Sequence, residues 1–107
     1  MSNERAGQTA VIFVSQRTAD DETGYAAAAE AMAALAATQP GYRGIDSMRD
    51  GDGLGITISY WADEASARAW RDNAEHARIR DLGRARWYRW YQLLVTEVRR
   101  DYRWKRG

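Results

Sequence analysis

The chain lacks cysteine, contains one histidine and one proline, and has no long apolar run among its 107 residues. The lack of cysteine excludes disulfide bonds, a thiolate nucleophile, iron–sulfur clusters and cysteine-bound zinc. A single histidine argues against a zinc site built wholly from protein ligands. No segment approaches the roughly 20 apolar residues that cross a bilayer, and the N-terminus MSNERAGQ lacks the apolar centre of a signal peptide. We therefore expect a cytoplasmic protein with no membrane segment and no metal.

The chain also lacks an excess of charge of either sign. Its 16 lysines and arginines oppose 15 aspartates and glutamates, for a formal net charge of +1. Nucleic-acid-binding domains usually carry a strong basic excess, so we expect no nucleic-acid partner. The residues in excess are aromatic, with five tryptophans and six tyrosines. The length fits one domain with one core.

Hydrophobic patterning predicts an alternation of strands and helices. Strands are expected over residues 9–16, 42–49, 54–61 and 88–102, and helices over residues 22–38 and from Asp63 to about Arg86, the latter with a continuation or third helical piece. The order β-α-β-β-α-β is that of the ferredoxin-like split βαβ fold, an α+β class with an antiparallel sheet. Right-handed crossovers place both helices on one face of that sheet.

The domain organisation follows from the same pattern. Residues 1–8 are polar and are expected to form a flexible N-terminal arm. Residues 9–102 form the domain, and residues 103–107 form a basic, aromatic tail.

Helices on one face leave the other face of the sheet bare. The apolar side chains expected to need cover are Val11, Phe13, Leu54, Trp61 and part of the last strand. Exposed together, they would make a large apolar patch. A symmetric homodimer that packs two sheets face to face, or joins them into a barrel, would cover them.

Five runs carry a family resemblance: QPGYRG (39–44), GITISYW (55–61), DEASARAW (63–70), NAEH (73–76) and GRARWYRWY (83–91). Their order and spacing resemble the antibiotic biosynthesis monooxygenase family of dimeric α+β barrel proteins, over roughly residues 9–102. Members similar to this sequence include cofactor-independent oxygenases of aromatic polyketides, haem-degrading enzymes and proteins with no known role. The resemblance implies a small aromatic substrate and no cofactor.

The resemblance suggests two candidate residues on the third strand. Trp61 occupies the place where the polyketide oxygenases have a tryptophan thought to line the substrate site, although an aromatic residue at a strand end also packs well without a ligand. Those oxygenases have an asparagine four residues earlier as a donor to the substrate oxygen, and here that position is Thr57. A hydroxyl donates one hydrogen bond but lacks the separate donor and acceptor of an amide.

Two further candidates lie elsewhere in the chain. Gln16 offers an amide on the first strand, where family enzymes often have asparagine; the alternative is a solvated strand end. His76 is the only side chain with an ordinary pKa near neutrality and is the first candidate for a general base. In the haem-degrading relatives an iron-binding histidine lies about ten residues after a tryptophan, whereas Trp70 and His76 are six apart. A surface position in a charged helix is the alternative for His76.

The aromatic cluster Trp87–Tyr91, with Trp104 in the tail, has three interpretations. Interleaved arginines could stack nucleic-acid bases, but the aromatic pattern of RNA-binding domains of this topology is missing. Packing across a dimer interface, where Trp, Tyr and Arg are favoured, is the preferred interpretation. Tyr88, with Trp70, is also a candidate to contact the substrate.

Two functions remain open from the sequence. The first is a cofactor-independent monooxygenase, with Trp61 and His76 as catalytic candidates and Gln16, Thr57, Trp70 and Tyr88 as substrate contacts. The second is a dimeric small-molecule-binding or accessory protein on the same scaffold, without turnover. Haem degradation is a distant third.

Overall fold

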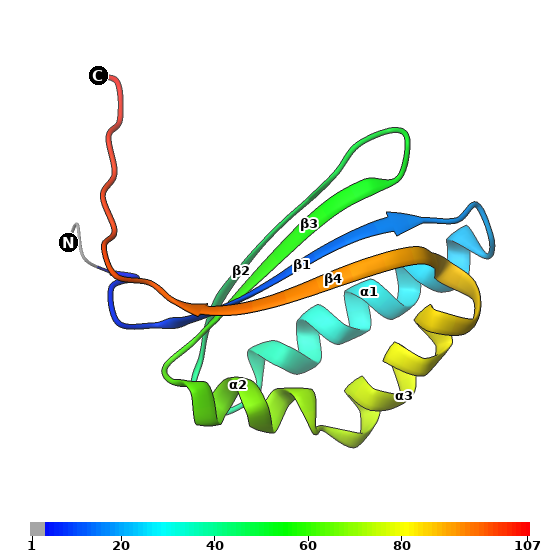
Figure 1. Cartoon of the computed structure of the whole chain (residues 1–107), viewed down its shortest axis with the longest axis horizontal. Helices are drawn as coiled ribbons and strands as arrows, with labels where there is room; N and C mark the ends of the chain where they lie inside the picture. Colours follow the sequence, from blue (N-terminus) through cyan, green and yellow to red (C-terminus); the bar gives the residue numbers. More distant parts are fainter. Residues whose placement is uncertain (1–3) are drawn as a thin grey trace.

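The computed structural model describes residues 4–107. Its elements are β1 (Thr9–Arg17), α1 (Glu22–Ala37), β2 (Tyr42–Arg49), β3 (Leu54–Trp61), α2 (Glu64–Arg71), α3 (Ala74–Leu82), the π-helix η1 (Gly83–Trp87) and β4 (Tyr88–Glu97). The strands form one antiparallel sheet in the order β2-β3-β1-β4, and the helices lie along one face of it (Figure 1). The predicted α+β, ferredoxin-like fold is confirmed.

β1 is a central strand, which explains why both of its faces carry apolar side chains. Val11 lies opposite Ser59 of β3 and Val95 of β4, so these three residues share one face of the sheet. Val11 packs against the core beneath the helices, which identifies this as the helix-covered face. Ile12 lies opposite Ile58 on the other face, which no helix covers.

The predicted second helix is divided into α2 and α3. Asp63 caps α2 as the sequence predicted, because its carboxylate accepts a hydrogen bond from the Ser66 amide at 2.8 Å. α2 ends at Arg71, and Asn73 caps the next helix. The Asn73 side-chain oxygen accepts hydrogen bonds from the backbone amides of Glu75 and His76 at 3.0 and 3.1 Å. A new cap begins a new helix, so the continuation predicted to about Arg86 is a separate helix followed by a π-helical turn.

β4 ends at Glu97 and not at Tyr102 as predicted. Its partner β1 begins at Thr9. Beyond that residue the pairing continues only through the backbone hydrogen bonds of Val98 with Gly7 and Gln8, each 2.8 Å long. Gly7 has a positive φ of 86°, so the partner segment turns away there. Of the expected N-terminal arm, residues 1–3 lie outside the described residues, whereas residues 7 and 8 are bonded to Val98.

The uncovered face of the sheet is apolar, but its residues differ in part from those predicted. Val11, Phe13 and Trp61 lie on the helix-covered face, because they share it with Ser59 and Thr57 in the register. The uncovered face is instead formed by Ile12, Val14, Met48, Leu54, Ile56, Ile58, Trp90 and Leu94. Both faces of β1 are apolar, so the strand pattern alone could not tell which one the helices would cover.

No helix within residues 4–107 is long and apolar enough to cross a membrane. Over the same residues, no group of three or more His, Cys, Asp or Glu side chains is placed to hold a metal ion.

Candidate functional site

Trp61 is the most deeply buried large side chain of the described residues. Its ring is 0% exposed and packs with Ala36 of α1 and Ala67 of α2. The indole nitrogen donates to the Ser59 hydroxyl at 3.0 Å. The prediction that this ring overhangs a pocket is not met here, since Trp61 lines neither of the two pockets described below. Small alanines on both helices let them approach the sheet closely and enclose the ring.

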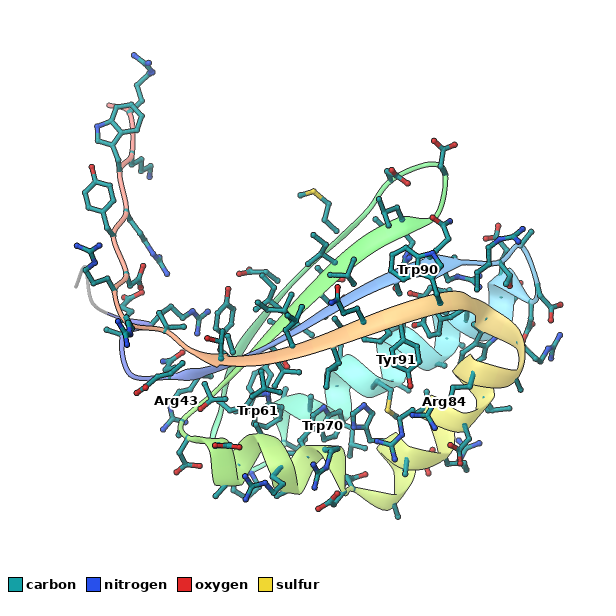
Figure 2. All side chains as sticks on the ribbon, in the orientation of Figure 1. Arg43, Trp61, Trp70, Arg84, Trp90 and Tyr91 are labelled. Atoms are coloured by element: carbon teal, nitrogen blue, oxygen red, sulfur yellow. The ribbon has the colours of Figure 1, made fainter. Side chains whose placement is uncertain are left out.

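Three stacked rings run outward from this core, and we call Trp61, Trp70 and His76 the aromatic ladder. The Trp61 and Trp70 centroids are 5.9 Å apart with planes at 26°, and those of Trp70 and His76 are 4.3 Å apart at 12°. Figure 2 shows Trp61 and Trp70 beneath the sheet, toward the helices. The structure thus brings together three of the six residues singled out in the sequence.

His76 is held by the backbone of the preceding helix. Its Nδ1 lies 3.0 Å from the Trp70 carbonyl oxygen. A carbonyl only accepts, so Nδ1 carries the proton and Nε2 presents a lone pair. Burial lowers the pKa of His76, and the positive charge of Arg80 lowers it further, against the opposing effect of the Trp70 hydrogen bond. The arrangement favours a neutral imidazole whose Nε2 carries the lone pair.

Thr57 lies on the helix-covered face, opposite Phe13. Its hydroxyl oxygen is 2.7 Å from the Ser47 hydroxyl oxygen, and either group can donate. Where Ser47 donates, the Thr57 proton is free for another acceptor. Thr57 therefore offers one donor at most, and only in one of two hydrogen-bond orientations.

Gln16 is on the wrong face for the predicted site. It lies opposite Leu54 and Trp90, with the side chains of the uncovered face. Its amide nitrogen donates to the Asp52 carbonyl at 2.8 Å, which fastens β1 to the turn between β2 and β3. A side chain on this face cannot reach the aromatic ladder without crossing the sheet.

Tyr88 packs in a second aromatic group on the helix-covered face. Its ring centroid is 5.4 Å from that of Phe13, 6.0 Å from Tyr25 and 6.1 Å from Tyr91. Burial, with the neighbouring Tyr25, raises the pKa of Tyr88, so its hydroxyl remains protonated. Gly83 makes room for it, because a Cβ there would lie 2.9 Å from Tyr88 Cε2.

The cluster predicted to pack at a dimer interface is divided between the two faces. Trp87 is buried and donates from its indole nitrogen to the Asp21 carboxylate at 3.3 Å. Tyr88 and Tyr91 pack on Phe13 in the same protomer. Trp90 alone points to the uncovered face, where it is 49% exposed.

Two arginines that the sequence analysis did not select meet at the far end of β1. Arg17 is buried, donates to the Trp87 carbonyl at 2.9 Å and stacks 3.9 Å from the Tyr25 ring centroid. Arg49 donates to the Ser15 and Tyr25 hydroxyl oxygens at 2.8 and 3.2 Å. In the sequence, the one sign of this contact was Arg17 at the end of a largely apolar strand.

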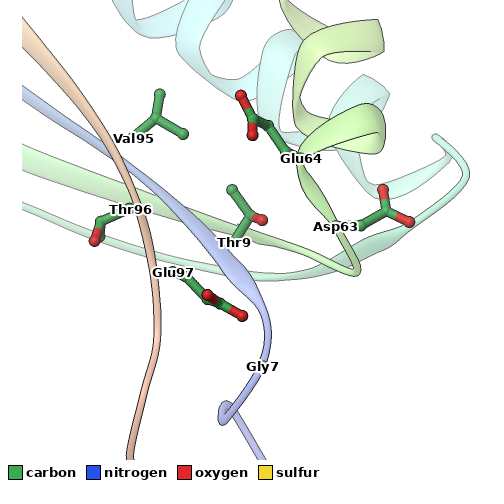
Figure 3. Close-up of a pocket in the computed structure, with 7 residues that line it drawn as sticks. All are labelled: Gly7, Thr9, Asp63, Glu64, Val95, Thr96 and Glu97. Carbon is green, nitrogen blue, oxygen red and sulfur yellow. The ribbon is translucent and has the colours of Figure 1, made fainter.

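Two open pockets are present among the described residues, and one of them is lined by a member of the aromatic ladder. The larger, of about 430 Å³, is lined by Gly7, Thr9, Asp63, Glu64, Val95, Thr96 and Glu97, and we call it the acidic groove (Figure 3). The smaller, of about 260 Å³, includes Trp70 in its wall. Between the sheet and the helices, Leu93 and Val95 remain 50% and 51% exposed although they lie on the helix-covered face. Apolar surface is therefore open to a ligand on that side of β4.

Known proteins resemble the chain in both sequence and fold. Residues 9–82 match the family model described as antibiotic biosynthesis monooxygenase. The uncharacterized protein YqjZ of Bacillus subtilis (strain 168) is 45% identical over 92 residues, which span 86% of this chain and 80% of YqjZ.

Solved structures share the fold at low sequence identity. SnoaB, a cofactor-independent oxygenase from Streptomyces nogalater, matches with a TM-score of 0.76 at 16% identity, over 89% of this chain and 96% of SnoaB. A conserved protein from Methanosarcina mazei Go1 matches with a TM-score of 0.79 at 9% identity, over 89% and 96% of the two chains. At such identities the likeness extends to architecture and not to chemistry.

Proposed function

The chain belongs to the antibiotic biosynthesis monooxygenase family, and from this premise we propose that it is a cofactor-independent monooxygenase of a phenolic aromatic molecule. The observation that carries the proposal is the state of His76. Its Nδ1 is fixed by the Trp70 carbonyl, its pKa is lowered by burial, and its ring is stacked on Trp70. A neutral imidazole can accept a proton at Nε2.

The reaction proposed needs a base and molecular oxygen. Nε2 of His76 takes a proton from the activated ring, and the resulting anion gives an electron to O₂. When a ring CH₂ is oxidised to a carbonyl, one oxygen atom enters the product and the other leaves as water, so the equation balances without a reductant. The protein would contribute desolvation and a hydrogen bond from Thr57 to the developing oxyanion.

A binding protein without turnover is the second candidate, and particular contacts favour it. Thr57 shares its hydroxyl with Ser47, and Gln16 is engaged on the opposite face. Trp61 has no surface available to a ligand. The donors that would stabilise a substrate oxyanion are therefore few, and each missing donor typically costs on the order of 3 kcal/mol of the barrier.

Oxygen uptake with an anthrone-type substrate tests the proposal. We expect slow turnover above the solution rate, a higher rate for Thr57→Asn because an amide adds a committed donor, and a lower rate for His76→Gln because the base is lost. Thr23→Asn is the matched control, since Thr23 is exposed on α1, away from both the aromatic ladder and the uncovered face. Background rates for all four proteins would reject the monooxygenase for this substrate class and favour the binding protein. Added haemin should leave its Soret band unshifted.

The uncovered face supports a further part of the proposal. We propose that a second copy covers this face in a homodimer, which would remove Leu54, Ile56 and Leu94 from water. We propose a cytoplasmic site of action for the dimer, on the sequence argument alone.

A further inference from the structure

The C-terminal segment 98–107, which we call the basic arm, extends away from the body of the molecule. Figure 1 shows it leaving the end of β4 on the side of the sheet opposite the helices. It carries five basic residues and one acidic residue. Tyr102 and Trp104 are 83% and 69% exposed, which is unusual for two large aromatic rings in a short segment.

Contacts at its root direct the basic arm away from its own domain. Val98 exchanges backbone hydrogen bonds with Gly7 and Gln8. The Asp101 carboxylate accepts from the Arg5 amide at 2.9 Å, and Arg103 lies 3.2 Å from the Glu4 carboxylate. Because Gly7 and Glu97 also line the acidic groove, the arm would have to reverse direction at its first residue to enter its own groove.

The acidic groove has the opposite charge. Three of its seven lining residues are carboxylates and none is basic. Asp63 caps α2 and Glu64 binds Arg68 at 2.7 Å, whereas Glu97 makes no ion pair within residues 4–107. The half-exposed Val95 gives the groove an apolar wall that suits an aromatic ring.

We propose that the acidic groove of one copy receives the basic arm of a second copy. Ten extended residues reach about 33 Å, and two face-to-face sheets lie about 10 Å apart. β4 is an edge strand, so an arm that starts beyond the uncovered face can pass around it to the helix side. The partner's arm would then cover the apolar surface that is exposed at Val95. The acidic groove would therefore be complete only when two copies associate.

Site-directed cross-linking tests this arrangement without relying on activity or on the proposed chemistry. The natural chain has no cysteine, so single cysteines report one contact each. Protein with Val95→Cys is mixed with protein carrying Lys105→Cys and oxidised. We expect a covalent pair on a non-reducing gel. Glu30→Cys, on the exposed side of α1, replaces Val95→Cys as the matched control and should give little product.

Charge reversal tests whether the cross-link depends on attraction between the basic arm and the acidic groove or forms by random collision of two copies. Changing Arg100 and Arg106 to Glu in the Lys105→Cys protein should lower the cross-link yield about tenfold, and Glu97→Lys in the Val95→Cys protein should partly restore it. These arm residues are exposed, so reversal leaves folding intact. Equal yields for Val95→Cys and Glu30→Cys, or a cross-link formed within one chain carrying both Val95→Cys and Lys105→Cys, would overturn the proposal. If the basic arm binds RNA or anionic vesicles and not the groove, Val95→Cys and Glu30→Cys should give equal yields.

Discussion

The two faces of the sheet differ in the kinds of side chain they carry, and the face without helices is the more aliphatic of the two. The face beneath the helices mixes aromatic rings with small polar residues such as Ser15, Thr57 and Ser59. The uncovered face is more uniformly aliphatic, with Ile12 and Ile58 at its centre. Aliphatic side chains that pair across strands without a covering layer are typical of a surface made for another protein.

The difference indicates a division of labour between the faces. The helix-covered face buries Trp61 and carries the candidate site residues Thr57 and Tyr88, so it contributes to the stability of the single chain and to the proposed site. The uncovered face is proposed to determine association. Changes on each face should therefore affect different measurements.

The largest effect is expected for Trp61→Ala. Removing a fully buried indole leaves a cavity under β3, and such changes typically cost about 3–5 kcal/mol of the free energy of unfolding. Urea denaturation followed by circular dichroism measures this loss. Trp104→Ala in the exposed arm is the control and should change the same quantity by less than about 0.5 kcal/mol. A loss below about 1 kcal/mol for Trp61→Ala would contradict the core position of this ring.

Ile56→Asp should break the proposed dimer. A carboxylate on the uncovered face would be buried without a partner in the pair, so we expect dissociation to be favoured about a hundredfold or more, close to 3 kcal/mol. Sedimentation velocity across a concentration series measures it.

The control for this change is Ile45→Asp on the helix-covered face. Ile45 and Ile56 are similarly exposed, at 37% and 46%, but they lie on opposite faces. Equal dissociation of both variants, or wild-type protein that is monomeric at micromolar concentration, would refute the assignment of association to the uncovered face.

Gly83→Ala should have an intermediate effect on the helix-covered face. The added Cβ would lie 2.9 Å from Tyr88 Cε2, and that ring is confined by Phe13 and Tyr25. Overpacking of this kind typically costs about 1–3 kcal/mol. Gly51→Ala has no heavy atom within 4 Å and should be close to neutral. Thermal unfolding of the two variants side by side distinguishes crowding at Tyr88 from a general effect of replacing glycine.

The smallest effect concerns pH. Burial lowers the pKa of His76 below its ordinary value of 6.5. The unfolded chain therefore binds the proton more readily, and this contribution to stability is present above about pH 6.5 and is lost as the pH falls through the lowered pKa of the folded protein. His76→Gln should reduce the loss between pH 7.5 and 5.5, measured by urea denaturation. An unchanged pH dependence would show that the ring is not desolvated.

Much of the architecture was predictable because hydrophobic periodicity and turn residues mark each element. Periodicity cannot tell which face receives the helices when both faces of β1 are apolar. The resemblance that suggested Gln16 likewise could not reveal that its side chain lies on the uncovered face. The depth of Trp61 depends on how closely two alanine-bearing helices approach, which is a tertiary property. Arg17 and Arg49 meet only through Tyr25 on a third element, and no local pattern predicts that contact.

The position of β1 at the centre of the sheet has a consequence for synthesis on the ribosome. β1 ends at Arg17, yet its partner β4 is complete only when Glu97 has been made, eighty positions later. At bacterial or eukaryotic elongation rates this interval lasts roughly 4 to 16 s. During that time a β-prone segment, TAVIFVSQR, has one edge without its final partner. We therefore expect the nascent chain to be most prone to aggregation before its last strand is made.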